Sequence, residues 1–140
     1  ALNQQLTSKV KLPVVQLRYI KLQDSSQIQA RVNSINVVPP IYMITMWEAG
    51  LQAWSPEEAR AVLAHEYAHI LNGDLDNGYK GRTLLSEANA DAMAVKILKK
   101  AGYRVCAMYD ALVTIKRYSG SSYELTQRIL KLEHGCKGGL

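Results

Sequence analysis

The chain has 140 residues and a mass of 15.6 kDa, the size of one ordinary domain, which excludes a multidomain enzyme. Hydrophobic residues make up 48% and charged residues 21%, so neither a disordered chain nor a disulfide scaffold fits. The net charge is +5, but the bases are scattered and form no polybasic run, which favours a solvated surface over a specific nucleic-acid interface.

The first part of the chain predicts β-strands. Val14–Leu22 is rich in β-branched and aromatic residues, and Gln27–Val32 alternates apolar with polar residues. The apolar phase then shifts by one residue, which predicts a β-bulge near Asn33 and Ser34. A pair of prolines ends this strand, and Ile41–Trp47 predicts another.

A helix start signal follows the strands. Ser55 can cap a helix, Pro56 suits its first position, and Glu58 completes a capping box. We expect this helix to run from Pro56 to about Asn72 and to end at Gly73.

The rest of the chain predicts three more helices. The polar loop Asp74–Arg82 leads to a helix over about Leu84–Ala101, which Gly102 ends. Two amphipathic segments then predict helices over Val105–Tyr118 and Tyr123–Glu133.

These elements predict one α+β domain spanning all 140 residues. A small antiparallel or mixed sheet of about three strands, within residues 14–47, packs on a helical half within residues 56–133. We expect residues 134–140 to form a flexible, glycine-rich tail. Cys106 and Cys136 lack metal-ligand spacing and fit either two free thiols or one disulfide.

No stretch of the chain is apolar enough to predict a transmembrane helix. The longest apolar stretches, around Val37–Trp47 and Ala61–Leu71, are short and interrupted by polar residues or prolines. The N-terminus carries no charged-then-apolar leader. We therefore expect a soluble protein, with the cytoplasm slightly favoured over export and the compartment otherwise open.

The strongest chemical pattern runs from His65 to His69 and spells HExxH. Two imidazoles at i and i+4 lie about 5 to 6 Å apart on one helix face, close enough to share a zinc ion. Glu66 is the next residue of the helix after His65, where its carboxylate can accept a proton from water. The helix is apolar on nearly all sides, and buried imidazoles and carboxylates need partners such as a metal ion. The competing interpretation is a pair of ordinary core histidines.

A catalytic zinc ion needs a third protein ligand, and the next helix offers Glu87. Glu87 and Asp91 are four residues apart and share one face, with alanines around them that permit close helix packing. Close contact would bring Glu87 to the metal and Asp91 to the outer nitrogen of a ligand histidine. The alternative for Glu87 is an acid that the helix dipole favours in the first turn.

These segments resemble a known family of enzymes. HEYAHILNGD, followed by EANADAMAVKILKKAGY, is similar to the HtpX-like and CAAX-prenyl-protease-like branch of the gluzincin metallopeptidases. The segment Asn33–Thr45 resembles the edge strand and hairpin that precede the active-site helix in that branch. Another HExxH family, the cytosolic repressor-cleaving proteases, also carries an E-A-N segment, but Asp91 and Ala101-Gly102-Tyr103 favour the first assignment.

The resemblance implies a zincin-like fold and a role for each matching residue. His65, His69 and Glu87 would bind one Zn²⁺ per chain, Glu66 would act as the general base, and Asp91 would support a ligand histidine. An extended peptide or unfolded protein substrate would lie along a strand formed by Asn33, Ser34, Ile35, Asn36 and Val37.

The sequence departs from this branch in two ways. Integral members carry transmembrane helices, so the chain looks more like the soluble, minimal catalytic domains called minigluzincins. Where the family often has a His-Pro pair before Glu-Arg-Ile, this chain has Ser121-Ser122-Tyr123 before Gln127-Arg128-Ile129. Tyr123 or Arg128 could donate a hydrogen bond to a developing oxyanion, whereas the simpler interpretation of Tyr123 is packing.

Three classes of function follow from the sequence. The first is a zinc metalloendopeptidase that hydrolyses peptide bonds with activated water. The second is a latent or inactive regulatory protein that binds zinc while a terminal tail fills its cleft. The third is a basic nucleic-acid-binding domain with an accidental motif, which would bind in a salt-sensitive way that chelators do not change.

Overall fold

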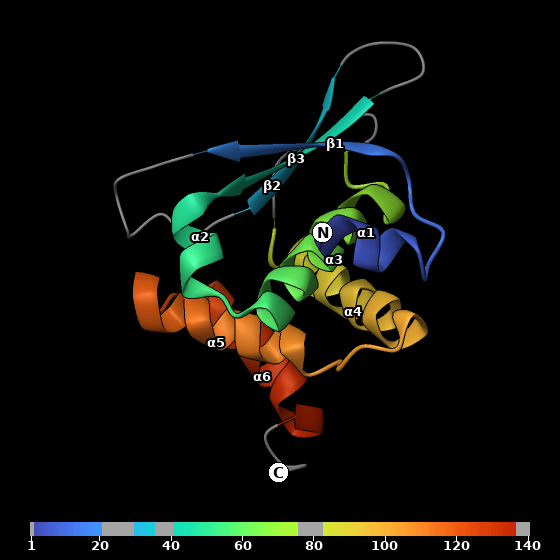
Figure 1. The fold of residues 1–140 in the computed structure, drawn as a ribbon. Coiled ribbons are helices and arrows are strands. Elements are labelled where there is room, and N and C mark those ends of the chain that lie inside the picture. The colour runs from blue at the N-terminus through green and yellow to red at the C-terminus, as the bar shows by residue number, and fades with distance from the viewer. Residues whose placement is uncertain (1, 21–29, 36–40, 76–82, 137–140) are drawn as a thin grey trace.

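The computed structural model describes residues 2–20, 30–35, 41–75 and 83–136. A three-stranded sheet lies over a helical half in this part of the chain, with helix α3 at the centre (Figure 1). The elements, in chain order, are α1 (Leu2–Thr7), β1 (Val15–Ile20), β2 (Ala30–Ile35), β3 (Ile41–Trp47), α2 (Glu48–Ala53), α3 (Pro56–Leu71), α4 (Leu84–Ala101), α5 (Ala107–Ser119) and α6 (Tyr123–Cys136). The fold is α+β with a mixed sheet, as predicted.

The sheet has the order β1-β3-β2, with β3 in the centre. β1 pairs with β3 in parallel, and β2 pairs with β3 antiparallel. The β2–β3 register advances one residue at a time from Ala30 opposite Met46 to Ile35 opposite Ile41. The predicted β-bulge near Asn33 and Ser34 is therefore wrong.

The apolar phase shift has a simpler cause than a bulge. Ala30, Val32 and Ser34 share one face of β2, because side chains alternate along a strand. Ala30 and Val32 are buried, whereas Ser34 is partly exposed towards the end of the strand. The polar Ser34 at this partly exposed position explains the shift in the apolar pattern without an extra residue in the strand. The predicted strand residues 21–22, 27–29 and 36–37 lie outside the described residues.

Two short helices, α1 and α2, are absent from the sequence prediction. Each has six residues, too few for a clear helical period. Leu6 of α1 is fully buried, and the Tyr67 hydroxyl donates to Asn3, so tertiary contacts hold this helix. α2 directly follows β3, and a Cβ atom at Gly50 would lie only 2.7 Å from the Trp54 ring. Glycine therefore allows Trp54 to pack against the helix.

Helix α3 begins where its capping signal predicts. The Ser55 hydroxyl accepts a hydrogen bond from the Glu58 amide at 3.2 Å, and proline occupies the first turn. From Ala61 to His69 every residue is buried, because β2, α4, α5 and α1 all pack around this helix. The HExxH residues thus lie inside the domain.

Helix α4 packs closely against α3 because both carry small residues. It begins with a capping box between Thr83 and Ser86 and ends at Gly102, whose φ of 83° favours glycine. The fully buried alanines on the two helices are Ala61, Ala64, Ala68, Ala90 and Ala94. α4 is the longest described helix, at 18 residues, yet neither it nor any other described helix is long and apolar enough to cross a membrane.

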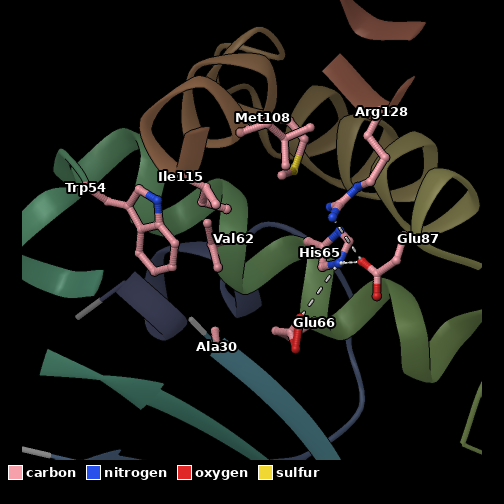
Figure 2. A pocket seen from close by; sticks show the side chains of 10 residues that line it. Ala30, Trp54, Val62, His65, Glu66, Glu87, Met108, Ile115 and Arg128 are labelled. Atoms are coloured by element: carbon pink, nitrogen blue, oxygen red, sulfur yellow. Dashed lines mark hydrogen bonds and ion pairs between the residues drawn. The ribbon is translucent and has the colours of Figure 1, made fainter. Parts of the chain in front are cut away.

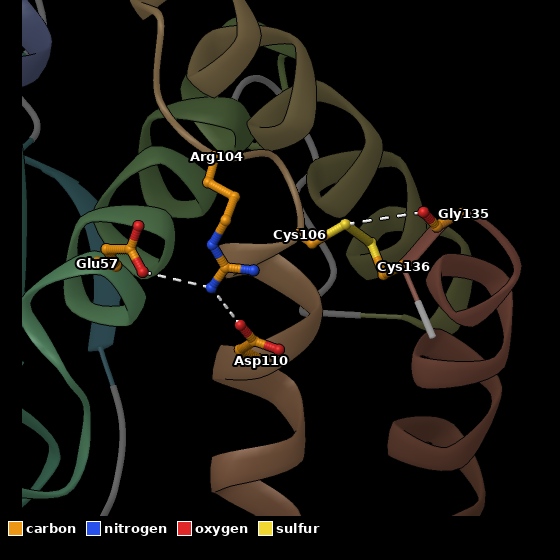
Figure 3. The surroundings of a disulfide bond; sticks show 6 residues. All are labelled: Glu57, Arg104, Cys106, Asp110, Gly135 and Cys136. Carbon is orange, nitrogen blue, oxygen red and sulfur yellow. Dashed lines mark hydrogen bonds and ion pairs between the residues drawn. A yellow bond between two sulfur atoms is a disulfide. The ribbon is translucent and has the colours of Figure 1, made fainter. Parts of the chain in front are cut away.

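The last two helices cover the opposite side of α3 from the sheet (Figure 1). α5 begins two residues later than predicted, and α6 continues to Cys136, beyond the predicted end at Glu133. A disulfide joins Cys136 to Cys106, just before α5 (Figure 3). This bond anchors the final turn of α6, so residues 134–136 are helical where a tail was predicted; residues 137–140 lie outside the described part.

Candidate metal centre

Two histidines of α3 face each other inside the domain. His65 and His69 are one helical turn apart, and their Nε2 atoms lie 3.1 Å from each other. Both side chains are buried. Glu66, also buried, completes a group whose possible ligand atoms all lie within 4.8 Å of one another.

Glu87 joins the histidines from α4. Its Oε2 atom lies 3.0 Å from His65 Nε2 (Figure 2). Its Oε1 atom lies 3.4 Å from His69 Nε2. The Glu66 carboxylate is farther from His65 Nε2, at 3.8 Å. Glu87 is thus the carboxylate that spans both imidazoles, as the close packing of α3 on α4 predicts.

Each histidine also has an aspartate on its outer nitrogen. His65 Nδ1 lies 2.9 Å from Asp91 Oδ1, and His69 Nδ1 lies 2.7 Å from Asp74 Oδ2. An ionised carboxylate only accepts hydrogen bonds, so the two aspartates favour a hydrogen on the Nδ1 atom of each ring. This arrangement directs both Nε2 atoms towards Glu87 and fixes the tautomer that binds metal ions.

Asp74 is not among the predicted site residues, although the local sequence carries a signal for its contact with His69. Gly73 has a φ of 75°, its amide donates to the Ile70 carbonyl, and the Asp74 amide donates to the His69 carbonyl at 3.0 Å. This Schellman turn places Asp74, the second residue after the C-cap, beside His69, five positions earlier. A glycine four residues after the second histidine of HExxH therefore predicts that Asp74 meets His69.

Arg128 of α6 pairs with both acids of α4. Its Nε and Nη2 atoms donate to Asp91 at 2.8 and 2.9 Å, and its Nη1 atom lies 3.4 Å from Glu87 Oε2. Tyr123 was the other candidate donor to an oxyanion, but its side chain is 75% exposed at the start of α6. The structure therefore brings Arg128 to the centre and leaves Tyr123 at the surface.

Electrostatics favour positive charge at this centre. Burial lowers the pKa of His65, but hydrogen bonds to Asp91 and Glu87 outweigh it and raise the pKa to about 9. Burial raises the pKa of Glu87, yet hydrogen bonds to His65 and His69 hold it well below its usual range. The pKa of Asp91 is also lowered, with burial opposed by hydrogen bonds to Arg128 and His65. The ionised carboxylates thus attract either a proton on His65 or a metal cation.

A cavity of about 120 Å³ opens beside His65 (Figure 2). One side is polar and includes His65, Glu66 and Arg128. The other side is apolar and is formed by Trp54, Val62, Met108, Leu112 and Ile115. This volume exceeds what one water molecule requires, so a water molecule and an apolar group can both enter.

Strand β2 passes along the same cavity. Ala30 lines the cavity, and β2 lies at an edge of the sheet among the described strands. The predicted substrate residues 33–35 belong to the same strand, several residues beyond Ala30. Asn36 and Val37 lie outside the described residues. Ala30 is thus the described β2 residue that lines the cavity, and the role predicted for residues 33–37 stays a prediction.

The residues present fit a zinc ion. Ligand atoms 2.0–2.1 Å from a tetrahedral zinc ion are separated from one another by about 3.3 Å. The two Nε2 atoms and the Glu87 carboxylate lie 3.0, 3.1 and 3.4 Å apart. Two imidazoles and one carboxylate also match the ligands that zinc takes in catalytic sites.

Substituting Asp74 should weaken zinc binding. Without the carboxylate, nothing holds the Nδ1 hydrogen of His69, so we expect Asp74→Ala to lower zinc affinity by about 10- to 100-fold. Asp74→Asn keeps a hydrogen-bond acceptor without the charge and should lose less zinc affinity. Competition with a chromogenic chelator measures both dissociation constants. An unchanged constant in Asp74→Ala would show that the contact does not support the ligand.

His65, Glu66 and His69 form a buried group that could hold a metal ion. The model of Peptidase family M48 matches residues 4–81, more than half of the chain, and the chain belongs to that family. Peptidases of this family depend on a metal ion, typically zinc, and the buried cluster is compatible with one. A search among curated proteins found no match to this chain. The matched segment ends before α4, so the roles of Glu87 and Asp91 rest on geometry.

Proposed function

We propose that this chain is a zinc-dependent endopeptidase whose metal ligands are His65, His69 and Glu87. The observation that carries the proposal is the convergence of three donor groups at zinc-like separations, with an aspartate behind each histidine. Membership in Peptidase family M48 supports the same reaction class.

Glu66 is the proposed general base. It follows the first ligand on α3, it is buried, and it lines the cavity. Its carboxylate can accept the proton of a water molecule in the cavity and then deliver that proton to the leaving amine. When bound, zinc acts as a Lewis acid that polarises the substrate carbonyl group and lowers the pKa of water.

The proposed substrate is an extended peptide or a segment of an unfolded protein. An edge strand can bind such a chain by β-augmentation, which recognises backbone groups and few side chains. β2 is suited to this because it lies at an edge of the described sheet and its first residue, Ala30, lines the cavity. The apolar wall of the cavity offers room for a side chain next to the scissile bond.

Within the family, we assign the chain to the HtpX-like branch and its soluble, minimal members. The support is the sequence of α4 and the turn after it, including Glu87, Asp91 and Ala101-Gly102-Tyr103. In the structure these residues form one helix and its glycine end, with both acids directed at His65.

Zinc content and cleavage of a denatured protein test the proposal together. We expect about one zinc ion per chain, cleavage of reduced and alkylated casein, loss of cleavage with a chelator, and recovery when zinc is added. Absence of zinc after reconstitution would contradict the proposed metal site. Full zinc content without cleavage would instead indicate the latent regulatory protein, and salt-sensitive nucleic-acid binding that ignores chelators would indicate the third class.

A further inference from the structure

We propose that Arg128 is a positioning residue of the metal centre and acts through Asp91 and Glu87. The inference rests on the proposed zinc site and deepens it, because it names a residue outside α3 and α4 that sets the affinity of that site. It also replaces the role expected from the sequence, in which Arg128 donates to an oxyanion.

One guanidinium group contacts two acids that serve two different ligands. Its Nε and Nη2 atoms bind both oxygens of Asp91, and Asp91 Oδ1 also lies 2.9 Å from His65 Nδ1. Its Nη1 atom lies 3.4 Å from the Glu87 oxygen that faces His65 Nε2. Arg128 thus fixes Asp91 behind one ligand histidine and restrains the ligand carboxylate itself.

The two acids need this cation in order to stay together. Glu87 and Asp91 are one turn apart on α4, and both are buried acids that share Arg128 as an ion-pair partner. Among the described basic side chains, Arg128 is the one that lines the cavity. Removing it leaves the buried carboxylates to repel each other, and Asp91 is then free to turn away from His65.

A free oxyanion donor would show a different geometry. Three nitrogens of the Arg128 guanidinium, Nε, Nη1 and Nη2, face Asp91 or Glu87. Each nitrogen of the guanidinium is therefore engaged with an acid, although the side chain also lines the cavity. Its planar fork suits this double contact, which the single ammonium group of lysine cannot reproduce.

The test separates positioning from the packing of α6. α6 buries Leu125 and Ile129 beside Arg128, so Arg128→Ala could also loosen the helix. Ile129→Ala serves as the matched control because it removes a buried contact of the same helix without touching the acids. Zinc dissociation constants are measured by chelator competition, and unfolding temperatures are measured for the same samples.

We expect Arg128→Ala to raise the zinc dissociation constant by about 10- to 100-fold, the range for residues that support metal ligands. Guanidinium ion at millimolar concentration should restore part of the affinity in Arg128→Ala. Ile129→Ala should lower the unfolding temperature yet bind zinc as the wild type does. The visible spectrum of the Co²⁺ form should change in Arg128→Ala only, since the ligand geometry is altered there.

Four outcomes would overturn the inference. Wild-type zinc affinity in Arg128→Ala would contradict it. An equal loss of zinc affinity in Ile129→Ala would also contradict it. A wild-type chain that binds no zinc would remove the proposed function, and this inference with it. If Arg128→Ala does not fold, Arg128→Lys replaces it, because lysine keeps the charge without the fork; wild-type affinity in that variant would also overturn the inference.

Discussion

Replacing Glu66 with glutamine is expected to abolish peptide hydrolysis while leaving one zinc ion bound. Glutamine has nearly the same shape but cannot accept a proton from water, and removing a general base costs about 10²- to 10⁴-fold in rate. The histidines and Glu87 keep their contacts, so zinc content should stay at the wild-type level. Cleavage rate and zinc content are measured on the same preparation.

Glu57→Gln is the control for this substitution. Glu57 lies in the first turn of the same helix, is exposed, and contacts Arg104 rather than the histidines. The Glu57→Gln protein should cleave casein at the wild-type rate. A Glu66→Gln protein that cleaves as fast as the wild type would remove Glu66 from the role of base.

Glu87→Ala should have the largest effect on zinc binding. It deletes the carboxylate whose oxygens lie 3.0 and 3.4 Å from the two Nε2 atoms, leaving two imidazoles of the proposed ligand set to hold the ion. We expect the loss of affinity to exceed the roughly 100-fold upper range for residues that only support a ligand. Hydrolysis should disappear at zinc concentrations that saturate the wild type.

Asn89→Ala is the matched control, since Asn89 is an exposed residue of the same helix. It should retain both zinc and activity. If Glu87→Ala binds zinc like the wild type, the third ligand is another residue, and Glu66 would be the first to test because it belongs to the same buried cluster.

The helix boundaries were the most predictable part of the fold, because their signals are local. Ser55 caps α3 and Gly102 ends α4, and both helices begin at the predicted residues. The HExxH spacing likewise fixes which two side chains meet, since a helix turn places them on one face.

Other features depend on contacts between distant segments, and the sequence did not predict them. α1 is held by Tyr67, 64 residues from its partner Asn3, and carries no periodic signal of its own. Arg128 was a candidate by resemblance, but its role follows from meeting Asp91 across 37 residues of sequence. Such pairings depend on how α6 docks on α4, which no local pattern specifies.

The disulfide between Cys106 and Cys136 closes α5, α6 and their connecting turn into a covalent ring. Arg128 belongs to this ring. A single peptide-bond cut at the exposed turn of Gly120, Ser121 and Ser122 would therefore leave both pieces attached to the domain. Such nicking would be invisible on a non-reducing gel and would appear as two fragments only after the sulfur bridge is reduced.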